Sequence, residues 1–430
     1  EEELKQAVTA TYVPLRDVVI NEYYQGEMRS DNTHYEEIPT NRGTAYLEKE
    51  AITDFQDVSL NVYTNNVFYN CFLGISRANI VLDHMDDAPR LSEDARKSMI
   101  GQVKFLRAFY YFKLVRYYGG VPLHLKEVTS TNEAFLPRSS ADEVYNQILE
   151  DAKEAVSLLA PPAKFPQTGE VTKGSATMLL AEIYLWQKKY AEAEALLKTL
   201  PEMGYELLPD YASVFSTGNK NSRESIFEVQ YQEGLQGGQQ SNFIYHFIPR
   251  SNNTTIITGV NTNNSTLGGY NVPTEDLLSA YESGDKRKAA SIAVAEGTYN
   301  ASYIFTYSAN LEIDNYTPVE GKTYVPYTKK YLNPHANPTN TDDNWPIYRY
   351  AEALLFMAEV LNEQNKPAEA LTYLNPIRQR AGLSEITETN QALLREIIIK
   401  ERRIELAFES KRWLDLVRTG KAKDVMTAYG

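Results

Sequence analysis

Two segments of this chain, 177 residues apart, repeat one pattern of small and bulky residues. Residues 181–184 read Ala-Glu-Ile-Tyr and residues 191–193 read Ala-Glu-Ala, whereas residues 358–361 read Ala-Glu-Val-Leu and residues 368–370 again read Ala-Glu-Ala. Apolar positions in each segment recur at the three- to four-residue period of a buried helix face. Each segment therefore predicts two helices joined by a tight turn, and the repetition predicts a mostly α fold.

The spacing within each segment is close to that of a tetratricopeptide hairpin. Small and bulky residues stand at the same offsets in both copies: Ala181, Tyr184, Ala193 and Leu197 in the first, and Ala358, Leu361, Ala370 and Leu374 in the second. Such hairpins bury their apolar faces only by stacking on neighbours. We therefore expect a tetratricopeptide-like scaffold in which the two hairpins share one superhelix.

Two longer helices are predicted ahead of the first hairpin. One runs from about Ile100 to Tyr117 and stops at the glycines and proline of residues 119–122. The other begins at Ser140, where Glu143 completes a capping box, and continues to about Leu159. These helices supply neighbours on which the hairpins can stack.

Between about Asn219 and Asn344 the composition changes to glycine, asparagine, threonine and tyrosine. This composition predicts loops and short strands, and loops on a rigid scaffold are where binding groups concentrate. We therefore predict a single domain over residues 1–430. It consists of a helical scaffold at about 1–218 and 345–430, and of an irregular, ligand-facing insertion at about 219–344.

The charge of the chain argues against one class of partner. The formal net charge is −14, and no long run of basic residues offsets it. Binding of nucleic acid requires concentrated positive charge, so we expect no nucleic-acid partner. No segment approaches the ~20 apolar residues of a membrane span, and the sequence opens on three glutamates instead of a signal peptide.

Residues that could support catalysis or metal binding are not arranged for either. The five histidines are scattered without the spacing of metal ligands: His34, His84, His124, His246 and His335. A nucleophile elbow, a phosphate loop and a dinucleotide fingerprint are missing. A glycosidase pair could still lie among the 57 acidic residues, because such pairs are set in space. We predict a binding protein and not an enzyme, with no catalytic residues, cofactor or metal ion.

The C-terminal segment, residues 400–418, alternates charge with apolar bulk at helical spacing. Four apolar residues spaced by 4, 7 and 4 predict one buried stripe: Leu393, Ile397, Ile404 and Phe408. The charged residues expected to flank this stripe and form ion pairs are Glu401, Arg402, Arg403, Glu405 and Arg412. The pattern predicts a terminal helix that docks by its apolar face.

This segment resembles the carboxyl-terminal signature of the SusD/RagB family, the surface nutrient-binding lipoproteins of Bacteroidetes outer membranes. Further segments match motifs of that family in the same order along the chain: residues 3–12, 77–82, 104–122, 137–145, 169–176 and 345–355. Among them, Arg77-Ala78-Asn79 and Gly119-Gly120-Val121-Pro122 stand out. The resemblance thus covers most of the chain.

The resemblance implies a protein on the extracellular face of the outer membrane that binds an oligosaccharide, or in some members a peptide. Its partner would be a TonB-dependent SusC-like transporter, which faces the helical scaffold, while the insertion faces the ligand. Members usually begin with a lipidated cysteine, but no cysteine precedes Cys71 here. We therefore expect the signal peptide and the lipid anchor to be absent from this chain.

Tyrosine is over-represented, with 31 Tyr against 15 Phe and 3 Trp. A tyrosine ring combines an apolar face with a hydroxyl at its rim, which suits contact with sugars. Because Trp186, Trp345 and Trp413 lie in scaffold motifs of the family, we expect them in the core. The candidate ligand-binding residues are tyrosines of the loop at 29–46 and of the insertion: Tyr35, Tyr46, Tyr299, Tyr303, Tyr307, Tyr316, Tyr324 and Tyr327. The alternative for those of the insertion is a packed strand or short helix.

Three classes of function stay open at this point. They are a glycan-binding transport lipoprotein, which we favour, a peptide-binding RagB-like member of the same family, and a helical adaptor without a small ligand. Exposed parallel tyrosines would indicate a glycan. A groove with unpaired strand edges and charged ends would indicate a peptide.

Overall fold

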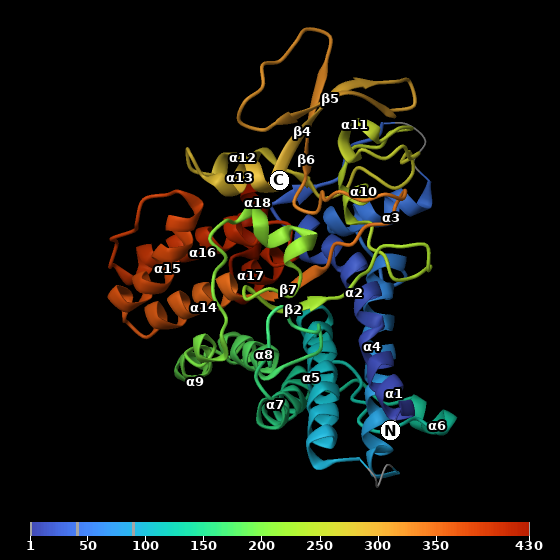
Figure 1. Cartoon of the computed structure of the whole chain (residues 1–430), viewed down its shortest axis with the longest axis vertical. Helices are drawn as coiled ribbons and strands as arrows, with labels where there is room; N and C mark the ends of the chain where they lie inside the picture. The colour runs from blue at the N-terminus through green and yellow to red at the C-terminus, as the bar shows by residue number, and fades with distance from the viewer. Residues whose placement is uncertain (1, 40–42, 88–90, 430) are drawn as a thin grey trace.

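The scaffold helices pack side by side in one continuous array (Figure 1). In the computed structural model, which describes residues 2–39, 43–87 and 91–429, α5 (Glu93–Tyr118) packs against both α4 (Val62–Asp83) and α7 (Ala141–Leu158). Helix α7 in turn packs against α8 (Lys173–Trp186). The two helices predicted from sequence ahead of the first hairpin are therefore present and are its neighbours.

The two predicted hairpins are α8 with α9 (Tyr190–Leu197), and α14 (Tyr350–Glu363) with α15 (Pro367–Ala381). Helix α14 packs against α9 and α8, so the two hairpins touch, as the repeated pattern predicts. The small residues of that pattern are all buried: Ala181, Ala193, Ala358 and Ala370. Small side chains at buried positions let neighbouring helices approach closely. The fold is mostly α, as predicted.

Local sequence signals set the ends of the helices. The Ser140 side chain accepts a hydrogen bond from the backbone N–H of Glu143, and the Glu143 carboxylate accepts one from the Ser140 N–H, which completes the predicted capping box of α7. Helix α5 ends at Gly119, whose φ of +73° favours glycine.

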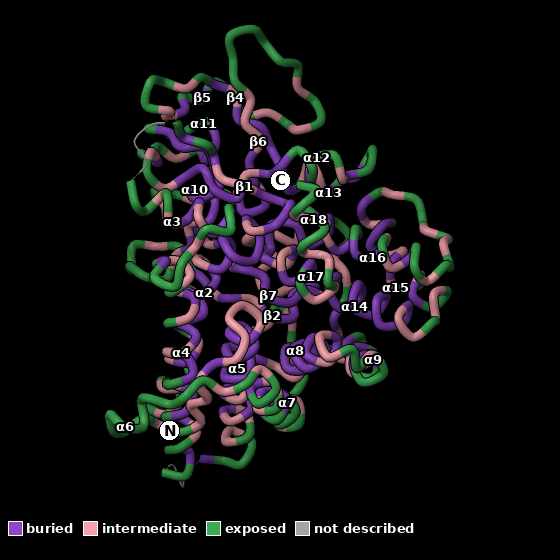
Figure 2. The backbone as a smooth tube through the Cα atoms, turned by 180° about the vertical axis from the view of Figure 1, so that it is seen from behind, coloured by how far each residue is buried: buried purple, intermediate pink, exposed green. Residues whose placement is uncertain are grey.

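The strands of the insertion form a three-stranded antiparallel sheet at the end of the molecule opposite to α7 (Figure 1). Its central strand, β4 (Ile292–Tyr299), pairs with β5 (Phe305–Glu312) on one side and with β6 (Thr323–Thr328) on the other. One face of the sheet packs on α10 (Phe243–Phe247) and α11 (Thr255–Thr258) in a small apolar core. The loop between β5 and β6 is largely exposed (Figure 2).

The chain enters and leaves the insertion through adjacent strands. Strand β2 (Ser225–Val229) pairs antiparallel with β7 (Trp345–Arg349), although some 120 residues of sequence separate them. The two-stranded ribbon therefore holds both ends of the insertion on the scaffold.

The remaining elements of the described chain cover this framework. They are α1 (Glu2–Tyr12), α2 (Pro14–Tyr23), a π-helical turn (Tyr24–Met28), β1 (Thr33–His34), α3 (Thr44–Thr53), α6 (Thr131–Ala134), β3 (Val272–Pro273), α12 (Glu275–Ala280), α13 (Lys286–Ser291), α16 (Gln391–Glu405), α17 (Arg412–Arg418) and α18 (Ala422–Tyr429), with short 3-10 turns between them. None of the helices described has the length and apolar content needed to cross a bilayer.

The terminal helix docks in a different phase from the one that its apolar residues predict. Ile404 and Phe408 are buried as predicted, but Leu393 is 56% exposed, Ile397 is only half-buried, and Phe408 lies beyond the end of α16. The prediction of one buried stripe is therefore wrong. The buried face of the helix carries Leu394, Ile398 and Ile404 together with Glu401 and Glu405. The acidic side chains turn inward because arginines from other segments meet them there.

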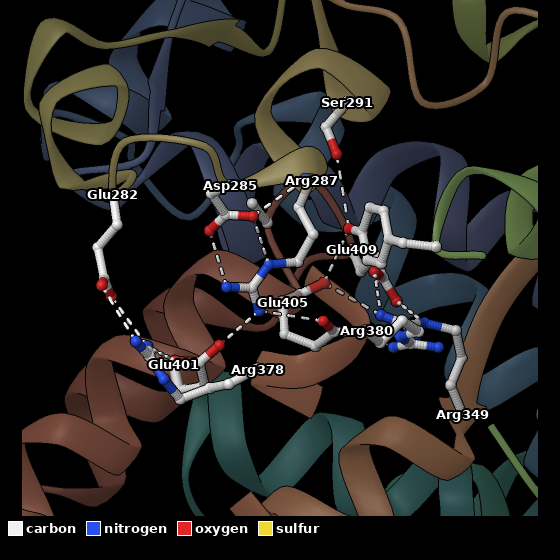
Figure 3. A network of polar contacts seen from close by, with 12 residues as sticks. Glu282, Asp285, Arg287, Ser291, Arg349, Arg378, Arg380, Glu401, Glu405 and Glu409 are labelled. Atoms are coloured by element: carbon white, nitrogen blue, oxygen red, sulfur yellow. Dashed lines mark hydrogen bonds and ion pairs between the residues drawn. The ribbon is translucent and has the colours of Figure 1, made fainter. Parts of the chain in front are cut away.

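These acidic side chains belong to a buried network of ion pairs (Figure 3). Glu405 accepts hydrogen bonds from three guanidinium groups: Arg380 at 2.6 Å, and Arg287 and Arg349 at 3.2 Å each. All four side chains are at most 4% exposed. Since Arg287 belongs to the insertion and the other three residues to the scaffold, the network ties the insertion to the scaffold.

The same network fixes the charge of its carboxylates. Burial by itself would raise the pKa of Glu409, but the charges of Arg349 and Lys330 outweigh it and lower that pKa to about 2. Burial is outweighed in the same way at Glu405, whose pKa is lowered by Arg380, Arg349 and Arg287. Both carboxylates therefore stay ionised in the folded protein at neutral pH.

One buried acid behaves in the opposite way. Glu27, in the π-helical turn, receives hydrogen bonds on Oε1 from the Asn32 side chain (2.8 Å) and the Phe408 N–H (2.9 Å), while Oε2 has no partner among the described residues. Burial raises the pKa of Glu27 to about 7. Because the pKa in an unfolded chain is about 4.3, the folded state holds a proton that the unfolded state has lost between about pH 4.3 and pH 7.

We therefore expect the free energy of unfolding to fall as the pH rises from about 4.3 to 7, with Glu27 contributing to that fall. Glu27→Gln should remove this contribution. The free energy of unfolding of the variant minus that of the wild type should be about 2 kcal/mol larger at pH 8 than at pH 5. Thermal or denaturant unfolding at the two pH values measures it. An equal effect of the substitution at both values would contradict the assignment.

Candidate ligand-binding site

The eight candidate tyrosines occupy four places in the structure. Two of them, Tyr307 and Tyr327, are 6% and 0% exposed in the apolar core beneath the sheet. The Tyr307 hydroxyl donates to the Pro249 carbonyl, and the Tyr327 hydroxyl donates to Asn310 Oδ1 at 2.8 Å. Since neither ring has a face open to a ligand, the packed-strand alternative holds for these two, and they drop out of the candidate set.

Three tyrosines, Tyr46, Tyr299 and Tyr303, surround one buried ion pair. That pair is Glu36 and Arg250, with 3.5 Å between Glu36 Oε2 and Arg250 Nε and both side chains 5% exposed. The Tyr299 hydroxyl donates a hydrogen bond to the other oxygen of Glu36. The Glu36 carboxylate thus links the 29–46 loop to the insertion.

Arg250 also contacts the other two tyrosines of this group. Its guanidinium carbon lies 5.7 Å from the centre of the Tyr46 ring, and its Nη2 donates to the Tyr303 carbonyl at 3.0 Å. The rings of Tyr299 and Tyr303 are 6.1 Å apart and inclined by 44°. Tyr46, Tyr299 and Tyr303 are all half-buried, so each residue stays partly exposed to solvent. We call these three tyrosines the ring cluster.

The backbone around the pair leaves room for the Glu36 carboxylate. The Glu36 N–H donates to the Gly269 carbonyl at 2.7 Å, and the Arg250 N–H donates to Glu36 Oε2 at 3.2 Å. Gly269 has φ +87°, and a Cβ there would lie 2.6 Å from Glu36 Oε2. Only glycine therefore fits at this position without displacing the carboxylate.

Burial governs protonation in this cluster. It raises the pKa of Glu36, against the opposing effects of the Tyr299 hydrogen bond and the Arg250 charge. Burial and then the Glu36 charge raise the pKa of Tyr299 well above its ordinary value, so its hydroxyl stays protonated and donates to Glu36. The arrangement offers ring faces and hydroxyl and carbonyl groups, which suits binding of a polar ring-bearing molecule.

A second pair of rings lies on the opposite face of the sheet. Tyr316, in the β5–β6 loop, stacks on Tyr324 of β6 with 5.2 Å between ring centres and 22° between planes. The Tyr324 hydroxyl donates to Glu296 Oε2 at 3.0 Å, and the Ser308 hydroxyl donates to Glu296 Oε1 at 2.8 Å. These side chains form a polar surface separate from the ring cluster.

The last candidate, Tyr35, stands apart from both groups. Its ring stacks on His34 at 4.1 Å, and its hydroxyl donates to Asp54 Oδ2 at 2.9 Å, next to α3. Among the three tryptophans, Trp345 is 1% exposed, whereas Trp186 and Trp413 are half-buried. Full burial thus holds only for Trp345.

Neither Glu36 nor Arg250 was among the candidates that the sequence suggested. Both stand in ordinary loop sequence, and they are 214 residues apart. Only their contact in the folded chain identifies them. Within the described ranges, no three His, Cys, Asp or Glu side chains gather as a metal ion would require.

Comparison with known proteins agrees with the fold and with the motifs along the chain. The family model described as "SusD family" matches residues 223–430, and the model described as "Starch-binding associating with outer membrane" matches residues 2–185. The two matches together span most of the chain. The protein belongs to the SusD/RagB family.

Three relatives illustrate the similarity. SusD-like proteins P38 and P25 of Formosa agariphila are 29% and 26% identical to this chain; each match covers 99% of the chain, and 85% and 84% of the relative. A solved structure described as a laminarin binding SusD-like protein is 25% identical, with a TM-score of 0.79 over 100% of this chain and 94% of that one.

Proposed function

We propose that the protein binds an oligosaccharide at the ring cluster, without cleaving it. The observation that carries the proposal is the meeting of tyrosines from two distant segments, Tyr46 on one side and Tyr299 and Tyr303 on the other, around Glu36 and Arg250. Ring faces can cover the C–H surfaces of sugars while hydroxyl and carbonyl groups bond the sugar hydroxyls. The laminarin-binding relative and the starch-binding family description support a glycan as the ligand.

We expect a dissociation constant between about micromolar and millimolar, because capture at a surface needs only about 4 to 8 kcal/mol of binding free energy. Tyr46→Ala combined with Tyr303→Ala should weaken retention on the cognate polysaccharide at least tenfold. Affinity electrophoresis in gels that contain single polysaccharides measures the effect. The melting temperature should change little because both rings are half-exposed.

The matched control is Tyr69→Ala, which removes a ring that is 64% exposed on the scaffold helix α4. This variant should bind as the wild type does. Unchanged retention in the double variant would move the site elsewhere, with Tyr316 and Tyr324 as the next surface to vary. Retention of peptides alone would support the RagB-like alternative, and release of shortened sugars would show an enzyme.

We further propose that the mature protein is anchored by lipid on the extracellular face of the outer membrane and passes its ligand to a TonB-dependent SusC-like transporter. The family description of association with the outer membrane supports this location. Purification of the full-length protein from native outer membranes should yield a complex with such a transporter. Recovery of the protein in the soluble fraction alone would contradict the proposal.

A further inference from the structure

The ring cluster encloses a cation whose charge is already balanced. Arg250 lies against the ring of Tyr46 and donates to the Tyr303 backbone carbonyl, and its carboxylate partner Glu36 lies at 3.5 Å. Both side chains are only 5% exposed. A buried guanidinium with a carboxylate partner has little remaining tendency to attract a second anion.

A described lysine on the same helix as Tyr46 packs on rings outside the cluster. Lys49 is on α3, as is Tyr46, but its ammonium lies over three other rings, at 4.3 Å from Tyr270, 5.1 Å from Tyr63 and 5.8 Å from Tyr24. It is 7% exposed. The cluster is carried and lined by the described residues 43–50, 248–253, 264–269 and 297–305. Within these four segments, the basic residues are Lys49 and Arg250.

We propose that the ring cluster accepts an uncharged glycan and rejects acidic ones, and that Glu36 is the residue that determines this specificity. A uronic acid or sulfate group placed on the rings would meet only engaged cations in these described segments. Arg250 is paired with Glu36, and the Lys49 ammonium is covered by three other rings. The acidic group would also be desolvated beside the Glu36 charge, in a protein whose net charge is −14. This inference rests on the proposed glycan-binding function.

The first test compares neutral and acidic polysaccharides on the wild-type protein. Laminarin, soluble starch and xyloglucan are the neutral probes, and polygalacturonate and alginate are the acidic ones, all in affinity gels at equal concentration. We expect retention by at least one neutral polymer and retention at least tenfold weaker by both acidic ones. If an acidic polymer binds as tightly as the best neutral one, the inference is overturned while the glycan-binding function stands. If no polysaccharide is retained, the proposed function itself fails.

The second test changes the charge balance with little change of shape. Glu36→Gln keeps an oxygen that can accept the Tyr299 hydroxyl but leaves the Arg250 charge without its partner. We expect affinity for polygalacturonate to rise at least tenfold in low salt and to fall back in 0.5 M NaCl, because added ions screen the charge. A residue with only a structural role would instead weaken binding of all ligands when replaced.

The double variant Glu36→Gln/Arg250→Gln is the matched control because it removes both charges of the pair. It should lose the affinity for polygalacturonate that Glu36→Gln gains. A melting temperature is measured for each variant to confirm folding. Equal polygalacturonate binding by wild type, single variant and double variant would exclude Glu36 as the determinant.

Discussion

Glu405→Ala should lower the free energy of unfolding by about 3 to 5 kcal/mol, because it leaves buried guanidinium groups without a shared acceptor. Glu405 receives hydrogen bonds from Arg287, Arg349 and Arg380 and is fully buried. When one member of a buried charge network is removed, the remaining charges stay buried without a partner, and their surroundings cannot solvate them. Denaturant unfolding monitored by circular dichroism at pH 7 measures the loss.

The control for this prediction is Glu396→Ala in the same helix. Glu396 pairs with Lys421, but its side chain is 58% exposed, so water solvates Lys421 when the carboxylate is gone. Its loss should cost less than about 1 kcal/mol. Similar losses for the two variants would show that burial of the network contributes little.

Trp345→Ala should also destabilise the protein strongly, by about 3 to 5 kcal/mol. The indole is 1% exposed and stacks on Tyr331, with 5.0 Å between ring centres and 10° between planes, while Phe243 packs on it at 4.9 Å. Because Trp345 belongs to the scaffold and both neighbours belong to the insertion, the cavity left by alanine would lie where the two meet. Thermal unfolding followed by tyrosine fluorescence would detect the loss.

Trp413→Ala is the matched substitution at a less buried tryptophan. Trp413 is half-buried, and its ring packs 5.4 Å from Phe55, which is itself 49% exposed. We expect the loss to be less than half of that for Trp345→Ala, since fewer contacts are removed and water already reaches the site. Equal losses at the two positions would contradict this ranking.

Local patterns in the sequence predicted most of the scaffold. The structure contains the hairpins at Ala181 and Ala358 and the capping box at Ser140. It also contains loops and short strands after Asn219. Such features depend on residues three to five positions apart, so the order of residues carries them. The family motifs rest on the same kind of local pattern.

The phase of the terminal helix could not be predicted in this way. Its apolar residues suggested that Leu393 would be buried, yet the side that carries Glu401 and Glu405 is buried instead. Arginines on α13, β7 and α15 stabilise this orientation of the helix by pairing with Glu401 and Glu405. No local pattern in the sequence connects these arginines with the helix. A charged residue is normally read as exposed, and only its distant partners reverse that reading.

By itself, the sequence determined the helical class, the repeated hairpins and the family. Each of these follows from the spacing of residue types along the chain. Only the tertiary structure decided which of the candidate tyrosines are buried and which lie together. It buried Tyr307 and Tyr327, and it brought Tyr46 together with Tyr299 and Tyr303 around an ion pair whose members are 214 residues apart. The physical reason is that burial and charge pairing depend on contacts between distant segments.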